Sequence, residues 1–243
     1  SCPKMVDDTI VPEGVRVNYE FHSSDTHVIA NEIKILDVER VDRIVVPSEF
    51  SRRRLLGLLN VDHLSKLSVE KNLLDTKSFA CDGPTAAAWD HGITPLVWVG
   101  RFDKGKGFRY FLRVLKLLPE HVRGTVIVSW ETEPARVGEF LGEAVACGVQ
   151  RRLELLLNVP PAELGSIFRQ ARDQGGAYVS TSMLESFGYS VLEAASCGLQ
   201  TVAFDLPALR EHDAQDDLVH FVAPGSVQAM AEVIELCTGS HLH

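Results

Sequence analysis

Two repeating patterns of apolar residues run along most of the chain. Apolar runs of four to six residues, bounded by polar residues or glycine, have the length of buried strands. The stretches between them place apolar residues three or four positions apart, which is typical of helices that cover a sheet. The expected strands are Leu96–Gly100, Thr125–Trp130, Leu153–Leu157, Ala177–Thr181, Thr201–Phe204 and Val219–Val222, and the expected helices are Phe108–Leu118, Arg136–Cys147, Ala162–Ala171, Tyr189–Cys197 and Val227–Cys237.

The regular alternation of strands and helices predicts the fold class of residues 91–243. Neighbouring parallel strands need crossover connections of about a dozen residues, and the spacing of the strands leaves room for them. We therefore expect an α/β fold with a Rossmann-type, doubly wound parallel sheet and helices on both faces.

The first 90 residues repeat the pattern less completely. They predict the strands Val15–Glu20 and Arg43–Val46 and the helices Asp25–Val38 and Phe50–Leu59, with Ser48 as the cap of the second helix. Two strands and two helices predict an incomplete amino-terminal α/β segment without a core of its own. The stretch from Asp75 to Thr94 predicts a linker, because it contains Gly83-Pro84 and a run of small residues. The expected division is therefore 1–90 and 91–243.

Composition and charge narrow the range of partners. With 243 residues, 45% hydrophobic residues and no long apolar run, the chain has the composition of a globular protein in water. The net charge of −9 disfavours a nucleic-acid surface and an anionic membrane as the main partner. The basic run Arg52-Arg53-Arg54 is then interpreted as a solvated helix face.

The cysteines and the amino-terminal residues of the chain indicate in which cellular compartment we expect the protein. Five cysteines, an odd number without any Cys-x-x-Cys pair, predict neither a disulfide framework nor a zinc site. The polar stretch from Ser1 to Asp8 lacks the apolar core of a signal peptide. Both features favour a cytoplasmic location.

One candidate motif follows the strand Ala177–Thr181 and runs from Glu185 to Glu193. Gly188 allows a tight turn into the next helix, and free backbone N–H groups at such a turn can bind an anion. Glu185 in the loop and Glu193 in the helix can both face the crevice at the carboxyl ends of the strands. Two carboxylates at this separation suit the hydroxyls of a sugar and a ribose that flank a diphosphate.

A second candidate motif, Gly100-Arg-Phe-Asp-Lys-Gly-Lys-Gly107, also joins a strand to a helix. It is nearly a P-loop, but Gly107 stands where a P-loop has the hydroxyl that holds Mg²⁺. A nucleotide hydrolase, with Asp205 as its second carboxylate, is therefore a weaker alternative. In the favoured interpretation Arg101 and Lys106 bind a diphosphate. The absence of a Gly-x-Gly-x-x-Gly motif after any strand argues against a nicotinamide enzyme.

Together, the two motifs make the chain resemble the retaining glycosyltransferases of family 4, also called group 1, and mainly their carboxyl-terminal donor-binding domain. Val99–Gly107 is similar to the family's Gly-Arg-Leu…Lys-Gly segment, and Glu185 and Glu193 match its pair of glutamates. Val41–Ser51 is similar to the segment that closes the family's acceptor domain. Asn72–Asp75 resembles, in a weakened form, the Asn-Gly-Val-Asp that follows.

The resemblance implies a GT-B fold and a role for each matched residue. Arg101 and Lys106 would bind the diphosphate and stabilise its charge, Glu185 would contact the donor sugar and Glu193 the ribose. Ser186, Phe187 and Gly188 would meet phosphate or sugar through backbone N–H groups. The implied reaction moves a sugar from a nucleoside diphosphate sugar to a saccharide, lipid or small-molecule acceptor, with retention and without metal or cofactor. Neither the sugar, the base nor the acceptor follows from the residues.

The chain departs from the family pattern in four places. The amino-terminal glycine-rich loop with the first acceptor-domain strands, and the final helix that crosses back, have no counterpart. Ser129–Glu133 replaces a glycine-rich turn, and Pro207-Ala208 replaces a Gly-Gly pair. The missing amino-terminal loop and the missing final helix predict slow transfer by this chain alone, whereas the two replaced turns leave the exact donor open. The missing segments also keep open a second hypothesis, a nucleotide-sugar binding module that needs a partner for catalysis.

Two groups of histidines complete the set of candidates. His22-Ser-Ser-Asp25-Thr-His27 could be a metal cluster, but a strand-end loop is the favoured interpretation. By the resemblance, His22 lies near the acceptor side of a cleft and is a candidate contact for acceptor or sugar. His241 and His243 lie in a polar tail for which we expect no role.

Overall fold

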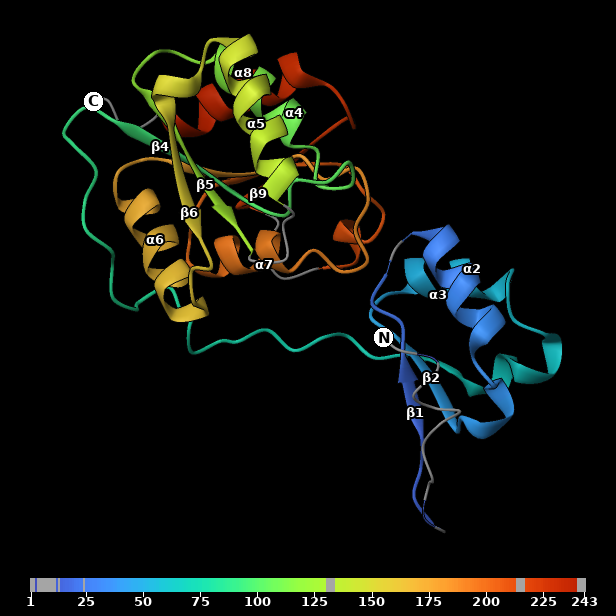
Figure 1. Ribbon diagram of the computed structural model, residues 1–243. Helices are drawn as coiled ribbons and strands as arrows, with labels where there is room; N and C mark the ends of the chain where they lie inside the picture. Colours follow the sequence, from blue (N-terminus) through green and yellow to red (C-terminus); the bar gives the residue numbers. More distant parts are fainter. Residues whose placement is uncertain are drawn as a thin grey trace. The chain divides into compact units, whose positions relative to one another are not determined.

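The computed structural model describes residues 3, 12, 14–23, 25–129, 134–212 and 217–239. The chain forms two compact units, which Figure 1 shows in the colours of the sequence. Unit 1 comprises Ser1–Leu73, Leu184–Gly188 and Pro207–His212, and unit 2 comprises Leu74–Met183, Tyr189–Leu206 and Asp213–His243.

Unit 2 contains a six-stranded parallel sheet in the order β6-β5-β4-β7-β8-β9. All six predicted strands are confirmed, with ends that differ by up to three residues from those expected, and Trp130 lies outside the described residues. The strands are β4 (Thr94–Val99), β5 (Val122–Val128), β6 (Leu153–Leu157), β7 (Ala177–Ser180), β8 (Thr201–Phe204) and β9 (Val219–Val222). Since β4 pairs with β5 on one side and with β7 on the other, the strand order reverses at β4. This is the topology of a doubly wound fold.

The five predicted helices of unit 2 are also confirmed, and their ends differ by at most two residues from those expected. They are α4 (Phe108–Leu117), α5 (Pro134–Cys147), α6 (Pro161–Asp173), α7 (Tyr189–Ser196) and α8 (Val227–Gly239). Short 3₁₀ turns at Gln150–Arg152 and Leu209–Glu211 add to them. One face of the sheet carries α4, α5 and α8, and α6 and α7 lie on the other face (Figure 1).

The core of unit 2 follows from the alternation of side chains along each strand. Alternate residues of β4, such as Leu96 and Trp98, join a buried cluster with α4, α5 and α8. The residue between them, Val97, is also buried, and points to the opposite face. On that face the rings of Phe168 in α6 and Tyr178 in β7 pack edge to face at 5.5 Å. Burial on both faces explains why these strands are continuous apolar runs.

Unit 1 corrects two of the expectations from the sequence. It contains three parallel strands, not two, in the order β1-β2-β3, and the unexpected third strand is β3. It also has a core of its own, in which Ile29, Ile44 and Leu55 are fully buried. Its elements are β1 (Asn18–Glu20), α2 (Thr26–Ile35), β2 (Arg43–Val46), α3 (Glu49–Leu56) and β3 (Leu67–Val69), with 3₁₀ turns at Val38–Arg40 and Val61–Lys66.

Side-chain caps explain where the two helices of unit 1 begin. The Asp25 carboxylate accepts hydrogen bonds from the backbone N–H groups of His27 and Val28 at the start of α2. Ser48 caps α3 as predicted, since its hydroxyl accepts from Ser51 N at 3.1 Å. The predicted helix Asp25–Val38 ends earlier, at Ile35, because Leu36 is extended and Asp37 caps a separate 3₁₀ turn.

The segment between Leu74 and β4 lies against α6. The fully buried guanidinium of Arg169 donates hydrogen bonds to the carbonyl oxygens of Ser78, Ala80 and Pro84. Further along, Trp89 N donates to the Gln174 side chain at 2.9 Å. The segment has no strand or helix, and the side chains of Arg169 in α6 and of Gln174, directly after α6, bind it to the rest of unit 2 by hydrogen bonds.

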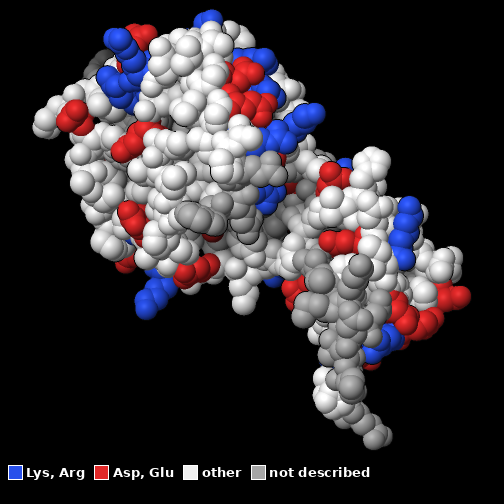
Figure 2. All heavy atoms as spheres, viewed as in Figure 1, with Lys and Arg blue, Asp and Glu red and all other residues white. Residues whose placement is uncertain are grey.

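Figure 2 shows acidic and basic side chains interspersed on the viewed face, without one continuous area of either sign. None of the helices in the described ranges is long and apolar enough to cross a membrane.

Candidate functional site

The strand order of unit 2 identifies one edge of the sheet as the place for a ligand. In open α/β sheets, ligands bind at the carboxyl ends of the strands where the strand order reverses. That point lies between β4 and β7, which are direct neighbours. The two predicted motifs follow these two strands, since the β4–α4 loop contains Arg101 and Lys106 and Glu185 comes after β7.

Asp103 organises the β4–α4 loop. One carboxylate oxygen pairs with Arg101 Nε at 3.0 Å, and the other accepts a hydrogen bond from Lys106 N at 2.9 Å. The Arg101 side chain is 54% exposed and can reach a ligand from outside the sheet. A single acidic side chain thus holds the guanidinium of Arg101 and the backbone of Lys106 in one loop.

The β4–α4 loop is hydrogen-bonded to the end of β7. Met183 N donates to the carbonyl oxygen of Gly105 at 2.8 Å, and the Thr181 hydroxyl donates to that of Lys106 at 3.1 Å. Thr181 is fixed in turn by Trp98 Nε1, which donates to its hydroxyl at 2.9 Å. The two neighbouring loops are therefore held together as one surface.

Gly107 is required where the β4–α4 loop meets α4. Its φ of +66° lies in the left-handed region, and a Cβ there would collide with the carbonyl oxygen of Thr181. The serine or threonine of a P-loop would have to occupy this same position. The structure therefore argues against the P-loop alternative, because its Mg²⁺-binding hydroxyl cannot be accommodated.

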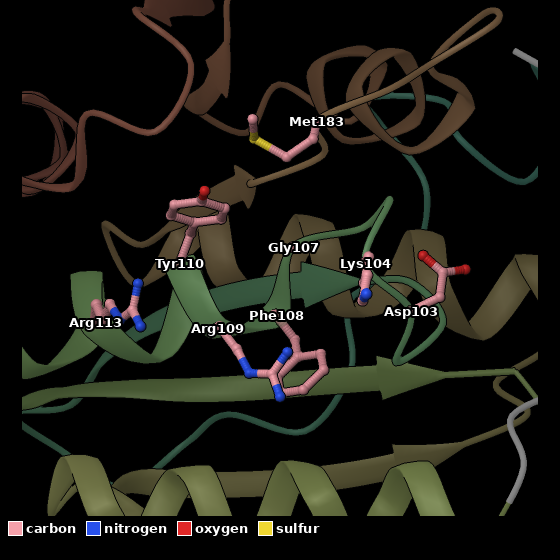
Figure 3. Close-up of a pocket in the computed structure, with 8 residues that line it drawn as sticks. All are labelled: Asp103, Lys104, Gly107, Phe108, Arg109, Tyr110, Arg113 and Met183. Carbon is pink, nitrogen blue, oxygen red and sulfur yellow. The ribbon is translucent and has the colours of Figure 1, made fainter. Parts of the chain in front are cut away.

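A cavity of about 230 Å³ lies beside this loop (Figure 3). The phenol ring of Tyr110 and the thioether of Met183 lie along it, together with basic side chains from α4 and the loop. Arg109 is already paired, since its guanidinium contacts Glu139 and Glu143 of α5. The lining residues are Asp103, Lys104, Gly107, Phe108, Arg109, Tyr110, Arg113 and Met183.

Glu193 is a half-buried carboxyl group in the second turn of α7. Burial, and secondarily the negative charge of Asp75, raise its pKa from an ordinary value of 4.5 to about 7. Asp75 itself is held as a carboxylate, because its side chain accepts hydrogen bonds from Ser78 and Lys77, which lower its pKa. A carboxyl group with a pKa near neutrality can accept or donate a hydrogen bond to a ligand hydroxyl.

The segment Leu184–Gly188, with Glu185, has its contacts in unit 1. The Ser186 hydroxyl donates to the backbone oxygen of His22 at 2.8 Å. Phe187 is buried, and its ring packs edge to face on His212 at 4.5 Å. Gly188 has a φ of +89°, as its predicted role in a tight turn requires.

The seven predicted site residues are thus divided by their contacts between the two units. Arg101, Lys106 and Glu193 belong to unit 2, and Glu185, Ser186, Phe187 and Gly188 belong to unit 1. Asp103, Thr181 and Asp75 were not among the predicted site residues. Asp103 stands inside the predicted motif, but nothing in the sequence indicates the contacts of Thr181 and Asp75, because they depend on the fold.

The alternative of a metal cluster near His22 finds no support in the described part of the chain. The imidazole of His22 lies 3.2 Å from the Glu20 carboxylate, and the Asp25 side chain caps α2. Among the residues that the structure describes, no three His, Cys, Asp or Glu side chains gather as metal ligands. The turn residues Trp130–Glu133 and the tail histidines His241 and His243 lie outside the described residues.

Comparison with curated proteins finds distant relatives. The chain is 27% identical over 202 residues to the lipopolysaccharide core biosynthesis mannosyltransferase LpcC of Rhizobium leguminosarum bv. viciae, covering 81% of this chain and 54% of LpcC. It is 23% identical over 207 residues to the phosphatidylinositol N-acetylglucosaminyltransferase GPI3 subunit of Saccharomyces cerevisiae, covering 82% of this chain and 44% of the subunit. The chain thus spans about half the length of these relatives.

Among solved structures, Anabaena Alr3699/HepE in complex with UDP-glucose has a similar fold. The TM-score is 0.74 at 16% identity, over 91% of this chain and 62% of HepE. At this identity the likeness concerns the fold, and it confirms the predicted GT-B-like α/β class.

The sheet, its switch point and the loops with Arg101 and Lys106 lie within a region that also matches a family of known proteins. Residues 94–238, more than half of the chain, match the family described as group 1 glycosyl transferases. The chain belongs to the group 1 glycosyltransferase family.

Proposed function

We propose that this chain moves a sugar from a nucleoside diphosphate sugar to an acceptor, with retention of configuration and without a metal ion. The family supports the class of reaction, and LpcC and the GPI3 subunit are a mannosyltransferase and a subunit of an N-acetylglucosaminyltransferase. Since HepE has been solved with UDP and with UDP-glucose, we propose uridine diphosphate as the carrier.

One observation carries the proposal, namely the basic β4–α4 loop at the switch point of the sheet. Arg101 extends from this loop with an exposed guanidinium, and Lys106 is fixed by its backbone next to the same Asp103. Arginine and lysine side chains at such an edge suit a diphosphate. As the bond to the sugar breaks, negative charge builds on the departing diphosphate, and the two cations would stabilise it.

The two glutamates take different parts of the donor in this proposal. Glu193, with its pKa raised to about 7, would bind the ribose hydroxyls, and Glu185 would bind the sugar. The backbone N–H groups of Ser186, Phe187 and Gly188 would meet phosphate or sugar oxygens. We assign no covalent intermediate to any of these residues.

Calorimetry with UDP and with a panel of UDP-sugars tests this division of roles. Glu193→Gln should weaken UDP and the tightest-binding UDP-sugar alike, because the ribose is common to both. Glu185→Gln should leave UDP binding nearly unchanged and weaken only the UDP-sugar. Glu235→Gln, an exposed glutamate on α8, serves as the control and should bind both ligands as the wild type does. An equal loss of UDP affinity in the Glu185 and Glu193 variants would contradict the assignment.

The second candidate function is a binding module that holds the donor while another segment or partner completes catalysis. The observation that favours it is that Arg101, Lys106 and Glu193, the residues proposed for the diphosphate and the ribose, all belong to unit 2, which has its own buried core. Incubation of the chain with UDP-sugar and candidate acceptors, followed by NMR of the products, separates the two. An α-linked product from an α-linked donor supports retaining transfer, and binding without turnover supports the module.

A further inference from the structure

Cys81 and Cys197 lie in contacting parts of unit 2, and the proposed transfer reaction uses neither of them. Cys81 is exposed in the segment before β4, and Cys197 is fully buried directly after α7. Both residues contact the same arginine of α6. Arg172 Nη1 lies 3.2 Å from the Cys81 sulfur and donates to the Cys197 carbonyl oxygen at 2.8 Å.

The Cys81 sulfur packs directly against the backbone next to Cys197. A Cβ added to Gly198, the neighbour of Cys197, would stand 3.1 Å from this sulfur. Gly198 has a φ of +80°, so the chain turns here in a conformation that suits glycine. The Cys81 sulfur therefore lies against the residue that follows Cys197, although the two cysteines are far apart in sequence.

We propose that Cys81 and Cys197 form an oxidisable pair, in which a peroxide oxidises Cys81 and Cys197 then closes a disulfide that ties the segment before β4 to the end of α7. In the first step the Cys81 thiolate attacks one oxygen of hydrogen peroxide and the O–O bond breaks. Cys81 becomes a sulfenic acid, and the hydroxide that leaves takes a proton from the solvent and becomes water. In the second step the Cys197 sulfur attacks the Cys81 sulfur. The S–O bond breaks, and the hydroxide leaves as water with the proton of Cys197.

The surroundings give the two cysteines different roles. Cys81 is accessible to solvent, and its sulfur lies 3.2 Å from Arg172 Nη1, so a peroxide can reach it. Cys197 is shielded, and burial raises its pKa to about 11, although the guanidinium of Arg169 at 3.7 Å acts in the opposite direction. Cys197 therefore stays protonated and meets no oxidant until a sulfenic acid forms beside it.

The raised pKa of Cys197 makes the second step slow and dependent on pH. The charged and titratable groups that face Cys197 are Arg169 and Arg172 of α6 and the Cys81 thiol. Far below the pKa, the thiolate fraction rises about tenfold per pH unit. The Cys81 sulfenic acid should therefore disappear faster as the pH rises from 7 to 9, which the amount that a 1,3-diketone reagent still traps at successive times measures.

Peptide mapping of the full chain tests the proposal. The reduced protein is treated with hydrogen peroxide, blocked with iodoacetamide and digested. We expect one pair of peptides joined through Cys81 and Cys197, an intact mass lower by two hydrogen atoms, and reversal by dithiothreitol. Oxidation of Cys81 to sulfinic acid without the joined peptides, or a disulfide between two chains, would overturn the proposal.

Cysteine variants test whether Cys81 is oxidised first and Cys197 then closes the disulfide. Cys197→Ala should lose the joined peptides and retain a Cys81 sulfenic acid that a 1,3-diketone reagent traps, and Cys81→Ser should lose both signals. Cys147→Ala removes another, half-buried cysteine and should behave like the wild type. The map of the wild-type protein decides the proposal even if the Cys197 variant unfolds.

Discussion

Asp103 orders the short loop that contains both cationic residues of the proposed diphosphate site. Its carboxylate pairs with the Nε atom of Arg101 and accepts from the backbone of Lys106. Among the described residues, no hydrogen bond is formed by the two terminal nitrogens of Arg101. Those nitrogens can therefore form the two parallel hydrogen bonds by which a guanidinium recognises phosphate.

Arg101→Ala should weaken UDP binding without unfolding the protein. The expected loss is about 1.5–3 kcal/mol, the range for a hydrogen bond to a charged group. The fold should survive because the side chain is largely exposed. Calorimetry measures the affinity, and Arg151→Ala, another exposed arginine of unit 2, is the control. A UDP affinity within a factor of two of the wild type would remove Arg101 from the site.

Glu193 should make stability depend on pH between its ordinary pKa and its raised one. Because the folded protein holds the proton up to a pKa of about 7, against 4.5 when unfolded, this stabilisation is complete below pH 4.5 and is lost as the pH rises through 7. Glu193→Gln stays neutral and should be more stable than the wild type at pH 8, by about 1–3 kcal/mol.

The gain from Glu193→Gln should shrink as the pH falls and vanish below pH 4.5. Urea unfolding of the two proteins at several pH values measures this difference. Glu235→Gln on α8 is exposed and should show no such trend. A difference that is the same at pH 5 and pH 8 would show that the carboxyl group of Glu193 is not buried as described.

At the scale of the elements, the β4–α4 loop and the end of β7 are joined by a close contact and a hydrogen bond between their backbones, and not by the packing of large side chains. We call this contact the joint. Gly107 approaches the carbonyl oxygen of Thr181, and Met183 N donates to Gly105. Such close approach of two backbones needs glycine, and it fixes the start of α4 relative to the end of β7. The position of Lys106 depends on this joint, because its own carbonyl accepts from Thr181.

Gly107→Ala and Gly142→Ala should change stability in opposite directions. Gly107 has a φ of +66° and no room for a Cβ, so the substitution should cost about 1–3 kcal/mol and weaken UDP binding. Gly142 lies within α5 with no atom near its added Cβ, so alanine should stabilise by about 0.5–1 kcal/mol. Urea unfolding and calorimetry check both. A harmless Gly107→Ala would disprove the proposed joint.

At the scale of the whole molecule, the proposed chemistry uses charged side chains where other nucleotide enzymes use a metal ion. Gly107 occupies the position at which a P-loop hydroxyl would hold Mg²⁺. Charge on the diphosphate would then be balanced by Arg101 and Lys106.

UDP binding should therefore be indifferent to divalent cations. Calorimetric titrations in EDTA and in millimolar Mg²⁺ or Mn²⁺ should give the same affinity within a factor of two. Arg101→Ala should remain weakened in both conditions. Tighter binding by tenfold or more with a divalent cation would contradict metal-independent recognition of the diphosphate.

Much of the fold and part of the site could be predicted from local patterns. The six strands and five helices of unit 2 are long, regular and apolar on the faces that they bury, so their periodicity is visible in the sequence. The strand β3 was missed because three residues, Leu67–Val69, are too few to show a period. Its neighbour β2 supplies the pairing that makes it a strand.

The sequence by itself determined the alternation of strands and helices, the two motifs and the residue types that suit a sugar nucleotide. These features depend on residues that are close together in the sequence, because the apolar periodicity and the capping residues of a segment largely determine whether it forms a helix or a strand. Only the tertiary structure decided that the carbonyl oxygen of Thr181 leaves no room for a side chain at position 107. It also decided that burial and the nearby charge of Asp75 raise the pKa of Glu193. It alone brought Cys81 beside Gly198. Such contacts join residues far apart in sequence, and their energies come from packing and desolvation, which no local pattern encodes.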